Sequence, residues 1–74
     1  LERQESAQQL FTAIAILPES QKVAYTLTQV EGFSYDEACE ITNTSKSAME
    51  SLIFRAKQHL RKTLETYYKT QFQS

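Results

Sequence analysis

The sequence predicts an all-α fold: a compact four-helix domain whose last two helices form a helix-turn-helix, the final helix being long. Apolar residues recur along the chain only with helical periods. The 74 residues include one Gly and one Pro, a composition that argues against long linkers. Capping signals separate the helical segments. We expect one domain over residues 1–74 and, since it begins at Leu1 without a methionine, a piece of a longer chain.

The first two helices meet at a proline. Residues 7–17 place apolar side chains on one stripe at helical spacing, and these are Ala7, Leu10, Phe11, Ile14 and Leu17. Pro18 cannot continue that helix but suits the first turn of the next one. The second helix is expected from Pro18 to about Glu31, with the inward-facing residues Val23, Leu27 and Val30. Gly32 then stands where a left-handed residue ends a helix.

The third helix begins at a capping box, Ser34-Tyr35-Asp36-Glu37, in which Ser34 and Glu37 each satisfy a backbone N–H. This short helix carries the apolar residues Ala38 and Ile41. Thr42-Asn43-Thr44 then breaks it, because Asn43 tolerates the left-handed conformation better than most residues. With Ser45 as the next N-cap, the third and fourth helices are about three residues apart, which is helix-turn-helix spacing.

The fourth helix, over residues 45–64, has two distinct faces at about 100° per residue. The inward stripe consists of Met49, Ile53, Ala56, Leu60, Leu64 and Tyr67. The opposite face consists of Ser47, Glu50, Ser51, Phe54, Arg55, Gln58, Arg61 and Lys62. Leu52 lies at the flank of the stripe and is expected to pack. The apolar stripe does not explain Phe54, which falls among charged residues.

A protruding helix after a tight turn can enter the DNA major groove, where each base pair displays a distinct chemical pattern. Arg55 is suited to guanine and Glu50 to the cytosine amino group. Ser51 can donate or accept, and Phe54 can lie against a thymine methyl group. The mixed face is therefore typical of a base-reading surface. A solvated face with one stray aromatic stays open on these residues alone.

Charge is distributed unevenly along the chain. Residues 1–45 carry a net charge of −5 (two bases against seven acids), and residues 46–74 carry +4 (six bases against two acids). Such asymmetry fits an anion bound at one end, although merely solvated helices can also produce it.

Cys39 stands alone, which excludes an internal disulfide and fits a cytoplasmic location. His59 and Asp36 belong to no catalytic set, and no ligand pattern predicts a metal or cofactor, so we expect no enzyme.

The residues resemble a known family. Residues 17–64, LPESQKVAYTLTQVEGFSYDEACEITNTSKSAMESLIFRAKQHLRKTL, are similar to the promoter-binding C-terminal region of bacterial sigma factors. The nearest likeness is to region four of the extracytoplasmic-function group. It rests on the order and spacing of Leu17-Pro18, residues 30–35, Glu37-Ala38 and the pattern of residues 51–64.

The resemblance implies that the helix-turn-helix reads the −35 element of double-stranded promoter DNA. It also implies docking to the beta flap of RNA polymerase in transcription initiation, and an anti-sigma factor as a further partner. Combined with the helix faces, it predicts base-facing residues Ser47, Glu50, Ser51, Phe54 and Arg55. The predicted DNA-backbone contacts are Ser34, Tyr35, Lys46, Gln58, Arg61 and Lys62.

Two positions depart from the family pattern. Position 50 is often Lys or Arg in the family and is Glu50 here, whereas position 28 is commonly Arg and is Thr28 here. Both changes are expected to remove positive charge that faces DNA. We therefore expect weak DNA binding by the isolated domain, with polymerase supplying the remaining affinity.

Two other functions stay open. One is a protein-interaction module for polymerase or an anti-sigma factor with little DNA binding of its own, since Tyr68 and Phe72 leave the inward stripe and can dock on a partner. The other is a dimeric helix-turn-helix regulator of another family, whereas the sigma reading predicts a monomer. A membrane role is not expected, because no apolar run approaches about 18 residues.

Overall fold

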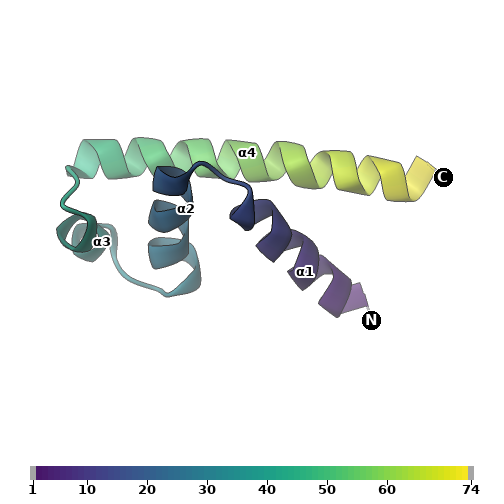
Figure 1. The fold of residues 1–74 in the computed structure, drawn as a ribbon, viewed down its shortest axis with the longest axis horizontal. Coiled ribbons are helices and arrows are strands. Elements are labelled where there is room, and N and C mark those ends of the chain that lie inside the picture. The colour runs from purple at the N-terminus through teal and green to yellow at the C-terminus, as the bar shows by residue number, and fades with distance from the viewer. Residues whose placement is uncertain (1, 74) are drawn as a thin grey trace.

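A computed structural model describes the backbone of residues 2–73 and the side chains of residues 7–66. It contains only helices over the described backbone, which confirms the all-α prediction (Figure 1). The elements in chain order are α1 (Glu2–Ala15), α2 (Glu19–Tyr25), the π-helix η1 (Thr26–Val30), α3 (Tyr35–Thr42) and α4 (Lys46–Gln73).

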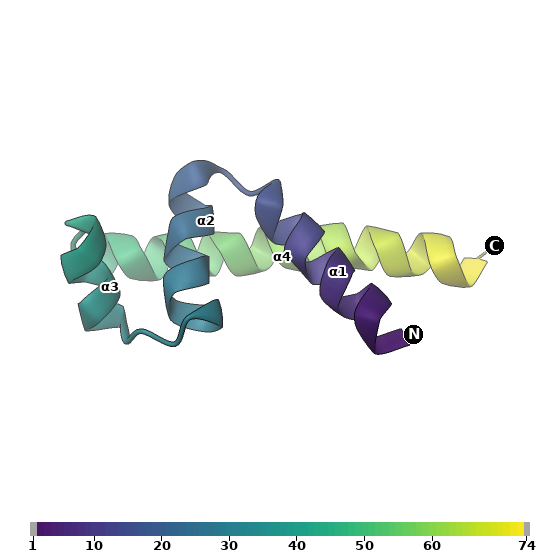
Figure 2. The same ribbon diagram turned by 60° about the horizontal axis from the view of Figure 1, so that its bottom comes forward.

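Helix α4 runs the length of the molecule, and α1, α2 and α3 all lie on one side of it (Figures 1 and 2). Its 28 residues correspond to about 42 Å at 1.5 Å per residue, close to the longest dimension of 45 Å. The predicted fourth helix therefore continues nine residues beyond Leu64. Helices α1, α2 and α3 are therefore arranged along α4 instead of around a common centre.

Two clusters of buried side chains hold the helices on α4. The first cluster joins α1 and the residues after it to the middle of α4, and consists of Ala13, Ile14, Leu17, Ala56 and Leu60. The second cluster joins α2 and α3 to the beginning of α4, and consists of Ala24, Ala38, Met49 and Ile53. The predicted inward stripe of α4 is confirmed as far as Leu64; Tyr67 lies outside the described side chains. Leu52 packs against the second cluster, as expected.

The predicted stripe of α1 is only partly correct. Ile14 and Leu17 are buried and Leu10 is partly buried, but Ala7 is exposed and Phe11 is 59% exposed. Because α1 packs mainly on one neighbour, α4, it buries a narrow strip that includes Ala13 and leaves Phe11 on its outer side.

The predicted second helix is present as α2 followed by η1, with Pro18 as the N-cap. The prediction that Val30 faces inward is wrong, since this residue is 48% exposed. In η1 the Glu31 amide donates to the Thr26 carbonyl, five residues back, at 2.9 Å. Gln21, Ala24 and Thr28 are buried at ordinary helical spacing, and Val30 lies outside that stripe.

Ile41, the other apolar residue expected on the third helix, is 55% exposed. Helix α3 has only eight residues and turns Ala38 toward its neighbours, with Tyr35 and Cys39 partly buried beside it. Ile41 lies at the flank of that narrow contact.

The caps and turns are confirmed. The Glu37 amide donates to the Ser34 hydroxyl at 3.1 Å, and the Ser34 amide donates to the Glu37 carboxylate at 2.8 Å. Asn43 is left-handed with φ 55°, and Gly32 has φ 84°. The Ala48 amide donates to the Ser45 hydroxyl at 3.2 Å, as expected for an N-cap. These contacts fix where α4 starts relative to α3.

Candidate nucleic-acid interface

The turn between α3 and α4 aims the first half of α4. The Thr44 amide donates to the Cys39 carbonyl at 2.9 Å across the left-handed Asn43. The hydroxyl groups of Thr42 and Thr44 are 2.8 Å apart and hydrogen-bonded, which ties the two sides of the turn together. Met49 and Ile53 then anchor the inner side of α4 in the second cluster. The opposite side of the helix is consequently held outward in a fixed orientation.

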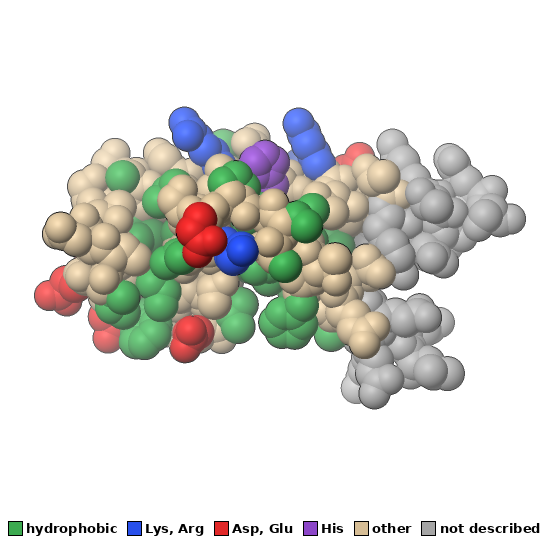
Figure 3. Space-filling model, in the orientation of Figure 1, with side chains coloured by type: hydrophobic (Ala, Val, Ile, Leu, Met, Phe, Trp, Pro, Cys, Tyr) green, Lys and Arg blue, Asp and Glu red, His purple; other side chains and the backbone are tan. Residues whose placement is uncertain are grey.

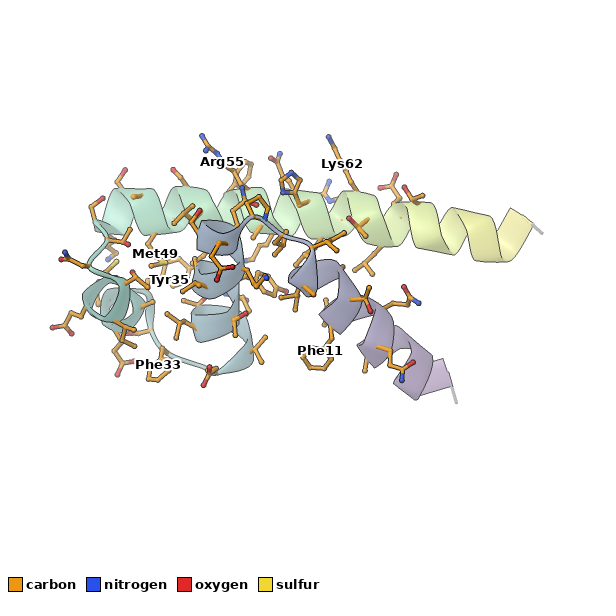
Figure 4. The ribbon with its side chains drawn as sticks, viewed as in Figure 1. Phe11, Phe33, Tyr35, Met49, Arg55 and Lys62 are labelled. Carbon is orange, nitrogen blue, oxygen red and sulfur yellow. The ribbon has the colours of Figure 1, made fainter. Side chains whose placement is uncertain are left out.

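All five predicted base-facing side chains are exposed on α4, and these are Ser47, Glu50, Ser51, Phe54 and Arg55. Figure 4 shows Arg55 pointing away from the other helices, whereas Met49 lies on the inner side. From residue 47 to residue 55 the helix rises about 12 Å, which corresponds to three or four base pairs. The five residues thus lie on the exposed side of α4, over a length that corresponds to about three or four base pairs.

The charged groups on this surface are available for a ligand. Within residues 7–66, neither Glu50 nor Arg55 forms an ion pair or hydrogen bond with another side chain. Phe54 is 62% exposed between them in the sequence. An unpaired acid, an unpaired guanidinium and an aromatic ring are therefore all exposed within residues 50–55 of α4.

The six predicted backbone-contacting residues have more varied environments. Gln58, Arg61 and Lys62 are exposed on α4, and Lys62 points to the same side as Arg55 in Figure 4. Ser34 is exposed but its hydroxyl and amide serve the capping box. Tyr35 is partly buried against the second cluster, on the inner side of α4.

Lys46, the sixth, is engaged within the domain. Its Nζ lies 3.6 Å from Oδ1 of Asp36, which is in the first turn of α3. Both side chains are largely exposed, at 63% and 79%. Asp36 therefore forms an ion pair with Lys46, the side chain that is predicted to contact a DNA phosphate.

The expectation that position 28 faces DNA is wrong. Thr28 was expected to stand where a positive charge faces DNA, but it is only 9% exposed. Its hydroxyl donates to the Ala24 carbonyl at 2.9 Å inside the helical layer. Because position 28 points into the domain, Thr28 does not weaken the outward charge of this interface.

One polar contact was not foreseen from the sequence. Nδ1 of His59 lies 2.9 Å from Oε1 of Gln21, joining α4 to α2. His59 is exposed, whereas Gln21 is buried. Nothing in the spacing of a single Gln and a single His, 38 residues apart, indicates such a pair.

Basic side chains are concentrated on α4, and acidic side chains on α3 and the segment before it. Residues 46–62 of α4 contain five basic side chains and one acid, Glu50. Residues 23–45 contain four acids and no base. Figure 3 shows Lys and Arg side chains along the edge formed by α4 and acidic side chains along the opposite edge, over α3 and the end of η1. An anionic ligand is therefore attracted to the α4 edge.

The described residues were also compared with the requirements of a metal site and of a membrane-spanning helix. Among the described residues, no group of three His, Cys, Asp or Glu side chains could hold a metal ion. Over the same part of the chain, no helix is both long and apolar enough to cross a membrane.

Comparisons with known proteins point to one family. The sequence profile of the family described as "Sigma-70, region 4" matches residues 7–60. The ECF RNA polymerase sigma-E factor of Haemophilus influenzae is 36% identical over 56 residues, covering 76% of this chain and 30% of that protein. The protein of the same name in Escherichia coli strain K12 is 36% identical over 55 residues, covering 74% of this chain and 29% of that protein. The chain thus spans about 30% of the length of the relatives it matches.

Proposed function

The chain belongs to the sigma-70 region 4 family, a family of DNA-binding domains and not of enzymes, and from this we propose that it directs transcription initiation. In this proposal α4 reads the −35 promoter element, and a second surface docks the domain on the beta flap of RNA polymerase. Family membership replaces the alternative of a dimeric regulator from another helix-turn-helix family.

The observation that carries the DNA-binding proposal is the composition of the outward face of α4. Its five residues Ser47, Glu50, Ser51, Phe54 and Arg55 are all exposed, although Phe54 is large and apolar. A surface selected only for solvation does not need an aromatic ring, and a surface that only grips phosphate does not need a carboxylate. Base edges offer partners for each of these groups.

The proposed contacts follow from chemistry. Arg55 can form two hydrogen bonds with guanine, and Glu50 can accept one from the cytosine amino group. Phe54 contacts a thymine methyl group. Arg61 and Lys62, farther along α4, contact phosphates, which position the helix but carry no sequence information.

The polymerase-docking proposal rests on α1. Phe11 lies on the outer side of α1 and points away from α4 (Figure 4). An aromatic residue with 59% of its surface exposed is a suitable anchor for a protein partner. Since Phe11 is on another helix than the base-facing residues, DNA and the beta flap can be bound together.

The DNA-binding proposal is tested by selecting duplexes from a randomised pool with the purified domain at low salt. An enriched motif that changes in the Phe54→Ala variant is the expected result. Enrichment that is identical for both proteins contradicts base reading by Phe54.

Docking is tested by binding of the isolated beta flap to the wild-type domain and to the Phe11→Ser variant. We expect weaker flap binding for Phe11→Ser and unchanged binding for Phe54→Ala, which serves as the matched aromatic control. Equal flap binding by all three proteins contradicts a role of Phe11.

The remaining alternative is a protein-interaction module with little DNA binding of its own. The exposure of Phe11 and Ile16 on or beside α1 is the observation that favours it. Absence of an enriched motif, together with tight flap binding, is the outcome that supports this alternative. The side chains of Tyr68 and Phe72, which first suggested it, lie outside the described residues.

A further inference from the structure

We propose that the domain has an additional docking surface, the α3 patch, which binds a basic segment of a partner protein through apolar anchors. The α3 patch consists of the apolar residues Val30, Phe33 and Ile41 and the acids Glu31, Glu37 and Glu40. This inference does not depend on DNA binding or on the beta flap.

The apolar part of the patch comes from three neighbouring segments. Val30 ends η1, Phe33 lies in the loop, and Ile41 is on α3. Their exposed fractions are 48%, 37% and 55%. The Phe33 amide donates to the Leu27 carbonyl at 3.0 Å, which holds the loop against η1, and α3 packs on η1. The three side chains are thereby held at one edge of the fold.

The acids border these apolar side chains. Glu31 lies between Val30 and Phe33 in the sequence, and Glu37 is one helical turn before Ile41 on the same face of α3. Glu37 is held in place by its hydrogen bond from the Ser34 amide. Figure 3 shows apolar side chains at this edge with acidic side chains beside them.

The charge of the patch is not neutralised within the domain. Among the described side chains, no ion pair involves Glu31, Glu37 or Glu40. The neighbouring bases are paired with other acids: Lys22, which lines a pocket with Glu31, lies 3.7 Å from Glu19, and Lys46 lies 3.6 Å from Asp36. Apolar groups surrounded by unpaired carboxylates complement a segment that presents apolar residues together with Lys or Arg. DNA is excluded as the occupant because it repels this charge.

The patch is separate from the DNA-reading face. Phe33 points away from α4 at the lower edge of the molecule, whereas Arg55 points outward at the upper edge (Figure 4). A partner on the α3 patch therefore leaves Arg55 and the outward face of α4 uncovered.

The proposal is tested with the ¹⁵N-labelled chain and two synthetic amphipathic helices, one built from Leu and Lys and the other from Leu and Glu. We expect the Leu/Lys helix to shift the amide signals of residues 30–41 and to bind more weakly as salt rises. The Leu/Glu helix is expected to bind at least tenfold more weakly. Equal binding of both helices, or shifts confined to other residues, overturns the proposal.

Variants separate the two parts of the patch. Ile41→Ser is expected to weaken binding of the Leu/Lys helix about tenfold or more, because it removes an apolar anchor. Glu31→Gln combined with Glu40→Gln is expected to weaken it about threefold to tenfold. The matched controls Phe54→Ser and Glu50→Gln remove an exposed aromatic and an acid from the other face, and are expected to leave the affinity unchanged. An equal loss in the controls contradicts a defined patch.

Discussion

Asp36 and Lys46 provide a test in which stability and DNA binding change in opposite directions. Their charged groups are 3.6 Å apart and join the first turn of α3 to the first turn of α4. Replacing Asp36 with Asn removes the partner of Lys46 and also one negative charge beside the proposed DNA surface. We expect Asp36→Asn to lower the stability of the domain and to strengthen its binding to DNA.

The magnitude follows from the geometry and the exposure of the pair. Two unit charges at this distance attract by about 1.2 kcal/mol in bulk water. Exposed pairs contribute about 0.2–1 kcal/mol, because salt and side-chain entropy reduce the attraction. Release of Lys46 is therefore expected to tighten DNA binding about 1.4-fold to fivefold. The free energy of unfolding is expected to fall by a similar amount.

The assay is fluorescence anisotropy with a promoter duplex over a range of salt, combined with urea unfolding. Lys46→Ala is expected to weaken binding and to reduce the salt slope by about 0.9 log units. In that background Asp36→Asn should have a much smaller effect on affinity. The reasoning is refuted if Asp36→Asn strengthens binding equally with and without Lys46, because the gain then comes only from general charge.

Three further predictions concern the site and the core. Arg55→Ala should cost about 1–3 kcal/mol on the preferred duplex, measured by competition binding, whereas an equal loss on every sequence makes Arg55 a phosphate contact. Glu50→Arg should change the preferred sequence in a duplex selection, and uniform tightening on all DNA contradicts this. Ile53→Ala should destabilise the domain by about 2–5 kcal/mol in urea unfolding, since Ile53 is 2% exposed, and a loss below about 1 kcal/mol argues against that burial.

The helices could be predicted from the sequence because the residues that start and end them act locally. The capping box of Ser34 and Glu37, the left-handed Asn43 and the N-cap Ser45 each act within four residues, so a single sequence contains the whole signal. Family membership was likewise predicted from residues 17–64 and is confirmed by the profile match. The residues predicted to face bases are exposed on α4, as expected, because a straight helix preserves its period over many residues.

The errors arose where burial depends on neighbours instead of period. Phe11 has helical spacing, but α1 presents only a narrow strip to the rest of the domain. The prediction failed at Val30 because the buried stripe of α2 and η1 includes the polar residues Gln21 and Thr28, which an apolar pattern does not mark. The Gln21 contact with His59 is a tertiary hydrogen bond, which depends on how α2 crosses α4.

The division of the interior into two clusters has a consequence for local opening. Within the described side chains, the cluster that supports the helix-turn-helix contains no residue of α1. Detachment of α1 therefore breaks the first cluster while leaving the second intact, and amide protons of α1 should exchange with solvent earlier than those at the start of α4. A partner that separates α1 from α4 is therefore expected to leave the helix-turn-helix, and with it the proposed reading of a promoter, intact.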